Sequence, residues 1–173
     1  MIIIVEGIDR VGKTTLVNAL RNVTGFPVYK NNTSFRLENM DNENETDKMI
    51  KMLQVCELGH VNIIFDRFHW TDLVYGVLQR AYDYDIAIKN KILIEDMLEK
   101  MGAMIVLVKP TDVYASSEQH GENLVYHDEL FNTLYDQSHM LKYSCRFQTL
   151  NSAERWVVSM LKSRGYHYVG CDF

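Results

Sequence analysis

The chain has 173 residues, of which 47% are hydrophobic and 24% charged, and its formal net charge is −5. These values predict one globular domain over residues 1–173, with one sizeable core. The acidic balance argues against an extended nucleic-acid surface, which needs clustered Lys and Arg, but it leaves room for a small basic pocket.

Targeting and redox features predict a cytoplasmic protein. No apolar run approaches the length of a membrane span, and no charged segment precedes the apolar N-terminus, so we expect neither a membrane partner nor a signal peptide. The three cysteines, Cys56, Cys145 and Cys171, are widely spaced and show no metal-binding pattern, which favours reduced thiols. The sequence leaves open whether the chain forms a homodimer.

The first motif along the chain is the glycine-rich segment Gly7–Thr14, with the spacing G-x-x-x-x-G-K-[ST]. An apolar, β-branched run at residues 1–5 predicts a strand before it, and apolar spacing over 16–23 predicts a helix after it. Strand, loop and helix are the context in which this motif binds phosphates through backbone amides. Lys13 adds positive charge and the Thr14 hydroxyl suits Mg²⁺, so the segment predicts a nucleotide-phosphate site.

Strands and helices alternate along the rest of the chain. Gly25 is expected to end the first helix, and Asn151, with Glu154 three residues later, is expected to cap the last one. This alternation predicts an α/β three-layer sandwich with a five-stranded parallel sheet that binds ligands at the carboxyl ends of its strands. The predicted strands cover residues 1–5, 26–30, 61–65, 104–108 and 147–150, and the predicted helices lie at 16–23, 49–56, 71–80, 86–101, 126–141 and 151–164.

The second motif, Asp66-Arg67-Phe68, follows the predicted strand at 61–65. The carboxyl end of this strand is expected to lie near the glycine loop. An Asp at that place can hold Mg²⁺ directly or through water, and an Arg beside it can bind a second phosphate bidentately. An exposed ion pair at the end of a strand is the simpler alternative.

Two segments of the chain resemble thymidylate kinases. Residues 3–15 are similar to the opening of that family, especially the subgroup with an Arg inside the glycine loop. Asp66-Arg67-Phe68, with Thr71 and Tyr75 after it, resembles the family's D-R-[YF] segment. The match is specific over the first 25 residues and from about 61 to 76. The resemblance implies a P-loop nucleotide kinase fold.

The resemblance also implies the reaction, which is transfer of the γ-phosphoryl group of ATP to a deoxynucleoside monophosphate, with dTMP or a related pyrimidine as acceptor. It implies Mg²⁺ as cofactor, held by Thr14 and Asp66, and Arg10, Lys13, Asp66 and Arg67 as catalytic residues. The implied ATP-binding residues are Gly7, Asp9, Arg10, Val11, Gly12, Lys13, Thr14 and Thr15. The implied acceptor-binding residues are Asp9, Lys30, Arg67, Phe68, Thr71 and Tyr75.

A charge count gives Arg10 a separate argument. The region at approximately 110–125 stands where such kinases close a lid over ATP, and many relatives bring a catalytic Arg from that lid. No Lys or Arg occurs between Pro110 and Leu141. Charge in the transition state must therefore be met elsewhere, and Arg10 of the glycine loop is the candidate already in place.

Departures from the family pattern leave the acceptor open. Residues 31–41 do not reproduce an expected Arg-Glu-Pro pattern, and Lys30 or Arg36 is expected to replace its phosphate contact. The alternatives are a kinase for a modified pyrimidine, such as hydroxymethyl-dUMP or that base within DNA, and a non-enzymatic P-loop switch. A nucleoside kinase is disfavoured, because it would not need Arg67 for an acceptor phosphate.

Overall fold

The computed structural model describes residues 1–31, 42–110, 123–146 and 149–166. Strands and helices alternate in it as the sequence predicts. In chain order the elements are β1 (Ile2–Glu6), α1 (Lys13–Thr24), β2 (Val28–Lys30), α2 (Asn42–Leu58), β3 (Ile63–Asp66), α3 (His69–Gln79), α4 (Tyr84–Lys100), β4 (Met104–Val108), α5 (Asn123–Gln137), β5 (Leu141–Cys145) and α6 (Leu150–Ser163).

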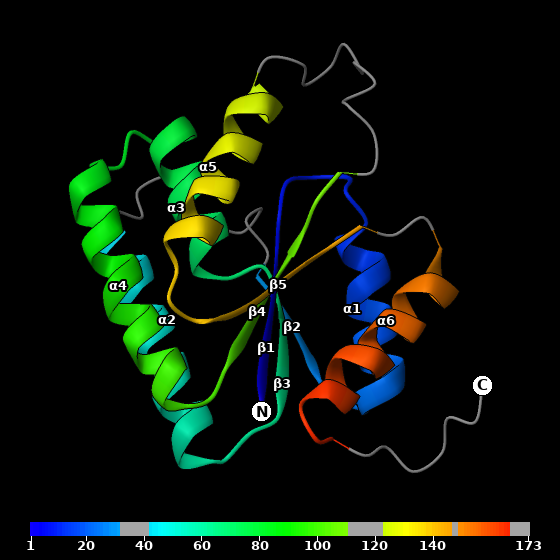
Figure 1. The fold of residues 1–173 in the computed structure, drawn as a ribbon. Helices are drawn as coiled ribbons and strands as arrows, with labels where there is room; N and C mark the ends of the chain where they lie inside the picture. The colour runs from blue at the N-terminus through cyan, green and yellow to red at the C-terminus, as the bar shows by residue number, and fades with distance from the viewer. Residues whose placement is uncertain (32–41, 111–122, 147–148, 167–173) are drawn as a thin grey trace.

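The strands form one parallel sheet in the order β2-β3-β1-β4-β5. Figure 1 shows the sheet nearly edge-on, with α1 and α6 on one face and α2 to α5 on the other. The predicted three-layer α/β fold with a five-stranded parallel sheet is therefore confirmed. Because β1 is central, the loop that follows it lies between the carboxyl ends of β3 and β4.

The central strands are apolar on both faces because helices cover both faces of the sheet. Every residue of β1 and of β4 is buried. On one face, α1 turns Leu16 and Leu20 inward, and it packs beside α6, whose Val157 and Leu161 are fully buried. The core thus fixes the end of β1, and with it the glycine loop.

The predictions for the region before the last helix are wrong. The helix expected at 126–141 ends at Gln137, and the strand expected at 147–150 is instead β5, at Leu141–Cys145. The reason is an interaction from outside the helix. The Lys142 ammonium group of β5 donates to the carbonyl oxygens of Tyr135 (2.6 Å) and Ser138 (2.7 Å) and so ends α5. As an edge strand, β5 also lacks the continuous apolar run that marks β4.

The cap predicted for the last helix is also wrong. Thr149, not Asn151, is the N-cap residue of α6, and its hydroxyl accepts from the Ser152 amide at 3.3 Å. The Thr149 amide in turn donates to the Ser152 hydroxyl oxygen, which completes a capping box. Glu154 instead accepts from the Asn22 side chain at 2.9 Å, which ties α6 to α1. Thr149 and Asn151 can both cap a helix. Glu154 does not complete a cap at Asn151, because its carboxylate is engaged by Asn22 of α1.

Helices α1, α3 and α4 begin within three residues of their predicted places, but α2, expected at 49–56, begins at Asn42 because its polar first turns show no apolar spacing. Gly25 ends α1 with its amide bonded to the Arg21 carbonyl, as predicted, and Asp83 caps α4. Most of the predicted lid (110–125) lies outside the described residues. Among the residues that the structure describes, no helix combines the length and the apolar character needed to cross a membrane.

Gly7 gives a test of how closely the glycine loop approaches the sheet. Its φ is +134°, and a Cβ at this position would lie 2.5 Å from the Val108 carbonyl oxygen. We expect Gly7→Ala to lower the free energy of unfolding by about 3 kcal/mol, since it adds a backbone clash to an unfavourable φ. Chemical denaturation measures the change.

Gly25→Ala is the matched control, because Gly25 also has a positive φ but open space around it. Only the left-handed backbone is penalised there, so we expect a loss of about 1 kcal/mol. Equal losses in the two variants would show that β4 yields easily to a methyl group at position 7.

Candidate functional site

The glycine loop joins β1 to α1 through three residues with positive φ. These are Gly7 (+134°), Arg10 (+65°) and Gly12 (+95°). Gly12 is also the N-cap residue of α1, and no side chain caps that helix. The first amides of α1 therefore lack a side-chain acceptor, which is the arrangement that receives an anion.

Lys13 is the buried cation of this loop. Its side chain is 6% exposed, its Nζ donates to the Ile8 carbonyl, and the same nitrogen lies 3.8 Å from Asp9 Oδ1. Burial lowers the pKa of Lys13 to about 8, although the charges of Asp66 and Glu6 act in the opposite direction. A phosphate group beside Lys13 would supply the negative charge that favours its protonated form.

Asp66 stands where the sequence predicts it, at the carboxyl end of β3. It is buried, and burial raises the pKa of its carboxyl group while the charges of Lys30 and Lys13 lower it. Lys30 ends β2 directly opposite Asp66 in the strand register. Two cations thus lie close enough to act on one buried carboxylate.

Asp66 and Thr14 fit the chemistry of a magnesium site. A nearby cation stabilises the ionised form of a buried carboxylate, and the Thr14 hydroxyl is exposed on the first turn of α1. In the described part of the chain, no group of three or more His, Cys, Asp or Glu side chains is arranged to hold a metal ion. Mg²⁺ does not need such a cage, since it takes one or two protein ligands together with phosphate oxygens and waters.

Arg67 reaches from the end of β3 to the glycine loop. Its guanidinium forms an ion pair with Asp9, whose carboxylate also lies near Lys13. Arg67 has a φ of +73°, and its backbone amide donates to the Val5 carbonyl at 3.0 Å. The left-handed turn directs the Arg67 side chain to the glycine loop. Lys13 of the first motif and Arg67 of the second therefore both lie near the Asp9 carboxylate.

Other predicted residues of the loop take different positions. Val11 is buried in the core, Thr15 is half-buried, and Arg10 is exposed. Arg10 makes no hydrogen bond or ion pair with any described residue. Its guanidinium is therefore available to a ligand above the loop.

Glu6 is a site residue that the sequence analysis missed. It has no exposed surface, and it accepts from the amides of Phe68 (2.9 Å) and Trp70 (3.1 Å) and from the Thr71 hydroxyl. Burial raises the pKa of Glu6, while the charge of His69 and these hydrogen bonds lower it. Thr71, predicted to bind the acceptor, is itself fully buried, so in this structure its hydroxyl serves Glu6.

Tyr75 follows on the inner side of α3. It is half-buried, its ring lies 4.7 Å from that of His127, and its hydroxyl has no hydrogen-bond partner among the described residues. Burial raises the pKa of Tyr75, and the charge of Arg67 lowers it. The Tyr75 hydroxyl is thus close enough to Arg67 for the guanidinium charge to affect its pKa.

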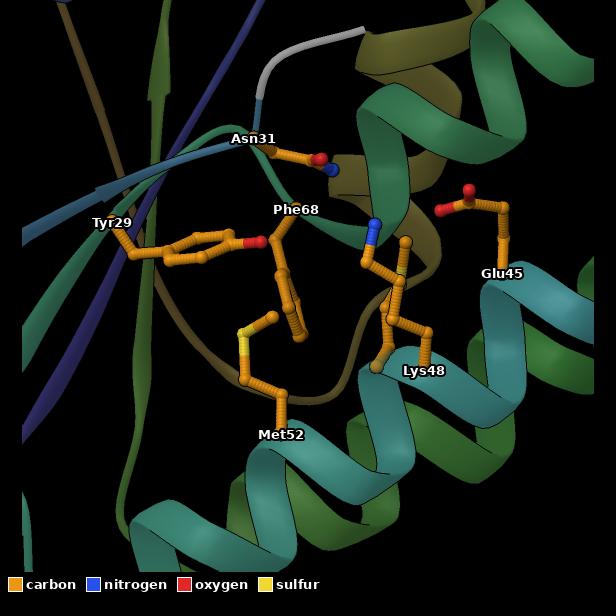
Figure 2. Close-up of a pocket in the computed structure, with 7 residues that line it drawn as sticks. Tyr29, Asn31, Glu45, Lys48, Met52 and Phe68 are labelled. Atoms are coloured by element: carbon orange, nitrogen blue, oxygen red, sulfur yellow. The ribbon is translucent and has the colours of Figure 1, made fainter. Parts of the chain in front are cut away.

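A pocket opens beside the Arg67 turn, between α2 and the ends of β2 and β3. Figure 2 shows its apolar part formed by Tyr29, Phe68 and Met52, and its polar part by Asn31, Lys48 and Glu45. Met49 completes the lining. Phe68 is the one lining residue that the sequence analysis had assigned. The α2 members recur at positions 45, 48, 49 and 52, a helical spacing that could have indicated a shared face.

Comparison by sequence gives no match, either to a family model or to a curated protein. Comparison of structures, in contrast, finds solved proteins with a similar fold. The YorR protein of Bacillus subtilis, solved with phosphorylated GDP, has a TM-score of 0.75 and 19% identity, covering 97% of this chain and 100% of that one.

Two further solved structures share the fold. A thymidylate kinase from Ehrlichia chaffeensis has a TM-score of 0.61 and 15% identity, covering 93% of this chain and 98% of its own. Deoxyadenosine kinase from M. mycoides, solved with dCMP, has a TM-score of 0.56 and 15% identity, covering 94% and 100%. At such identities the likeness establishes the fold, and this chain has the α/β fold of P-loop nucleotide kinases.

Proposed function

We propose that this protein transfers the γ-phosphoryl group of ATP to a deoxynucleoside monophosphate, with dTMP or a related pyrimidine monophosphate as the acceptor. The observation that carries the proposal is the ion pair between Arg67 and Asp9. It sets a second phosphate-binding cation directly beside the glycine loop, and a protein that only binds ATP has no need of one.

In the proposal, the glycine loop holds the donor. The backbone amides from Gly7 to Gly12 and at the start of α1 surround the phosphates of ATP, and Lys13 neutralises their charge. Thr14 and Asp66 would hold Mg²⁺, which would supply positive charge to the phosphates. Arg10 reaches the transferring phosphoryl group from the loop itself.

The acceptor lies on the β3 side of the loop. Arg67 exchanges the Asp9 carboxylate for the acceptor's phosphate, and Lys30 adds charge from the end of β2. Asp9 is then free to accept from the sugar hydroxyl, and Tyr75 lies beside the sugar. The structure supports this assignment because Asp9 contacts both Arg67 and Lys13.

The pocket beside Arg67 suits the acceptor's base. The Phe68 ring offers an aromatic surface, and the Asn31 amide can both donate and accept hydrogen bonds. A pyrimidine presents carbonyl acceptors and an N–H donor on one edge, which complement Asn31 and the Lys48 ammonium group. The cavity itself has a volume of only about 10 Å³, so a base would enter it by displacing the flexible side chains of Met49 and Met52.

The chemical step needs no general base on the protein. An oxygen of the acceptor's phosphate, already ionised, forms a bond to the γ-phosphorus as the bond from that phosphorus to the bridging oxygen of ADP breaks. The products are ADP and the nucleoside diphosphate. Catalysis then rests on alignment of the two phosphates and on positive charge around the moving group.

A panel of acceptors tests the proposed function. Release of ADP is measured with ATP, Mg²⁺ and, in turn, dTMP, hydroxymethyl-dUMP, the other deoxynucleoside monophosphates, thymidine and hydroxymethylated DNA. We expect turnover with a free pyrimidine monophosphate and none with thymidine, which has no phosphate for Arg67. Slow hydrolysis that no acceptor accelerates would indicate a nucleotide-binding switch instead.

Arg10→Ala tests the source of charge in the transition state. We expect ATP to bind with unchanged affinity and kcat to fall by on the order of 10³, as for removal of an arginine finger. Arg21→Ala is the matched control, because Arg21 is an exposed cation on α1 remote from the loop, and its kcat should stay at the parent value. Equal kcat for Arg10→Ala and the parent would remove Arg10 from the mechanism.

The lowered pKa of Lys13 predicts how ATP binding depends on pH. Only the protonated amine attracts the phosphates, so the Kd of ATP should rise as the pH passes about 8, approaching tenfold per pH unit. Calorimetric titrations between pH 7 and pH 9.5 measure this. In Lys13→Arg the charge persists over the whole range, so its profile should be flat even if its affinity is lower. A flat profile for the parent would contradict the assignment.

A further inference from the structure

Glu6 is the last residue of β1, directly before the first glycine of the loop, and its carboxylate faces the start of α3. Its Oε1 accepts from the amides of both Phe68 and Trp70, and its Oε2 accepts from the Thr71 hydroxyl. All three donors belong to the segment that follows Arg67. A fully buried carboxylate on one strand is therefore bonded to the start of a helix that follows another.

The start of α3 depends on this carboxylate. Phe68 is the N-cap residue of α3, and it provides no side-chain cap. The first amides of a helix have no partner within it and need an acceptor from elsewhere, above all where they are buried. Glu6 provides that acceptor from β1, and its negative charge also suits the positive end of the helix dipole.

Arg67 lies between two contacts made by neighbouring residues of β1. The amide of Arg67 donates to the carbonyl of Val5, and the next amide, that of Phe68, donates to Glu6. Arg67 itself has a φ of +73°, a conformation that a non-glycine residue holds only where its surroundings fix it. The two residues before Gly7 thus clamp the backbone on both sides of this turn.

We propose that Glu6 is a positioning residue for acceptor binding: it holds the left-handed turn at Arg67, so that the guanidinium faces the glycine loop at the distance that phosphoryl transfer requires. The inference rests on the proposed function and names a residue outside its catalytic set. Glu6 fixes Arg67 relative to the loop because it is covalently joined to Gly7.

A rival role for Glu6 is that of a general base, which a kinase acting on a free hydroxyl would need. Both oxygens of Glu6 are already occupied by donors, and the side chain has no exposed surface. A base must reach the proton that it removes. The two roles predict different behaviour for a glutamine at this position.

Glutamine can reproduce the positioning contacts. Its Oε1 can accept from both amides as Glu6 does, and its Nε2 can donate to the Thr71 hydroxyl oxygen, which reverses that hydrogen bond. Glutamine cannot serve as a base. Glu6→Gln should therefore keep the acceptor KM within about threefold of the parent, whereas Glu6→Ala should raise it by about tenfold or more with the Kd of ATP nearly unchanged.

A double-mutant cycle with Arg67→Ala makes the test specific to positioning. If Glu6 acts through Arg67, adding Glu6→Ala to Arg67→Ala produces no further rise in KM for the monophosphate that the parent accepts. Glu95→Gln is the matched control, because Glu95 is also a fully buried carboxylate that contacts α3, through the Trp70 indole. We expect its acceptor KM to stay within about twofold of the parent.

Several outcomes would overturn the inference. They are an unchanged KM in Glu6→Ala, additive losses in the double variant, or a kcat in Glu6→Gln that lies on the order of 10² below the parent, as loss of a general base would cause. If Glu6→Ala does not fold, Thr71→Val removes one of the three donors and should raise the acceptor KM by about threefold, and no rise would overturn it. A parent that releases no ADP with any monophosphate contradicts the proposed function instead.

Discussion

Val5 of β1 lies opposite Asp66 of β3 in a parallel register, and Glu6 lies opposite Leu107 of β4. Parallel strands end at the same edge of a sheet, so this register brings the glycine loop and the Asp66-Arg67 segment together although 58 residues separate Asp9 from Arg67. Specific contacts hold this register, because a shift by one residue would separate the Arg67 amide from the Val5 carbonyl and Glu6 from the Phe68 amide and the Thr71 hydroxyl.

The charges at this edge of the sheet compensate one another. Lys13 and Asp66 are both buried, and burial shifts their pKa values toward the neutral forms, while each one's charge opposes the shift in the other. Asp9 neutralises Arg67 in the same way. In the proposed reaction, phosphate groups take over these partners. The folded protein thus keeps a cluster of cations at one edge of the sheet in spite of its net charge of −5.

Two buried carboxylates hold α3 from different sides. Glu6 binds the backbone at its start, and Glu95 of α4 binds its side chains, accepting from the Trp70 indole at 2.8 Å and lying 3.5 Å from His69 Nε2. Burial alone would raise the pKa of Glu95, but the hydrogen bonds of His69, Lys91 and Trp70 lower it to about 2. Of the two, Glu6 contacts the backbone directly after Arg67, whereas Glu95 contacts side chains of α3.

The sequence alone determined the features that short-range chemistry controls. The glycine loop is written in consecutive residues, since it needs small residues at fixed places and a strand and a helix on either side. The continuous apolar runs at 1–5 and 104–108 predicted central strands for the same reason, and the alternation of elements predicted the parallel sheet. The functional roles of the site residues stay predictions, although the structure brings Asp9, Lys13, Asp66 and Arg67 together.

Only the tertiary structure decided what depends on partners distant in the chain. The end of α5 is set by Lys142 on β5, and no local pattern marks it. The lining of the pocket joins α2 to the ends of β2 and β3. The hydrogen bond from the Thr71 hydroxyl to Glu6 also depends on the fold. No local pattern marks Glu6, because its role depends on the hydrogen bonds that it accepts from the start of α3. Hydrogen bonds across the fold assign these roles, because a buried polar group must find its partner wherever the chain brings one.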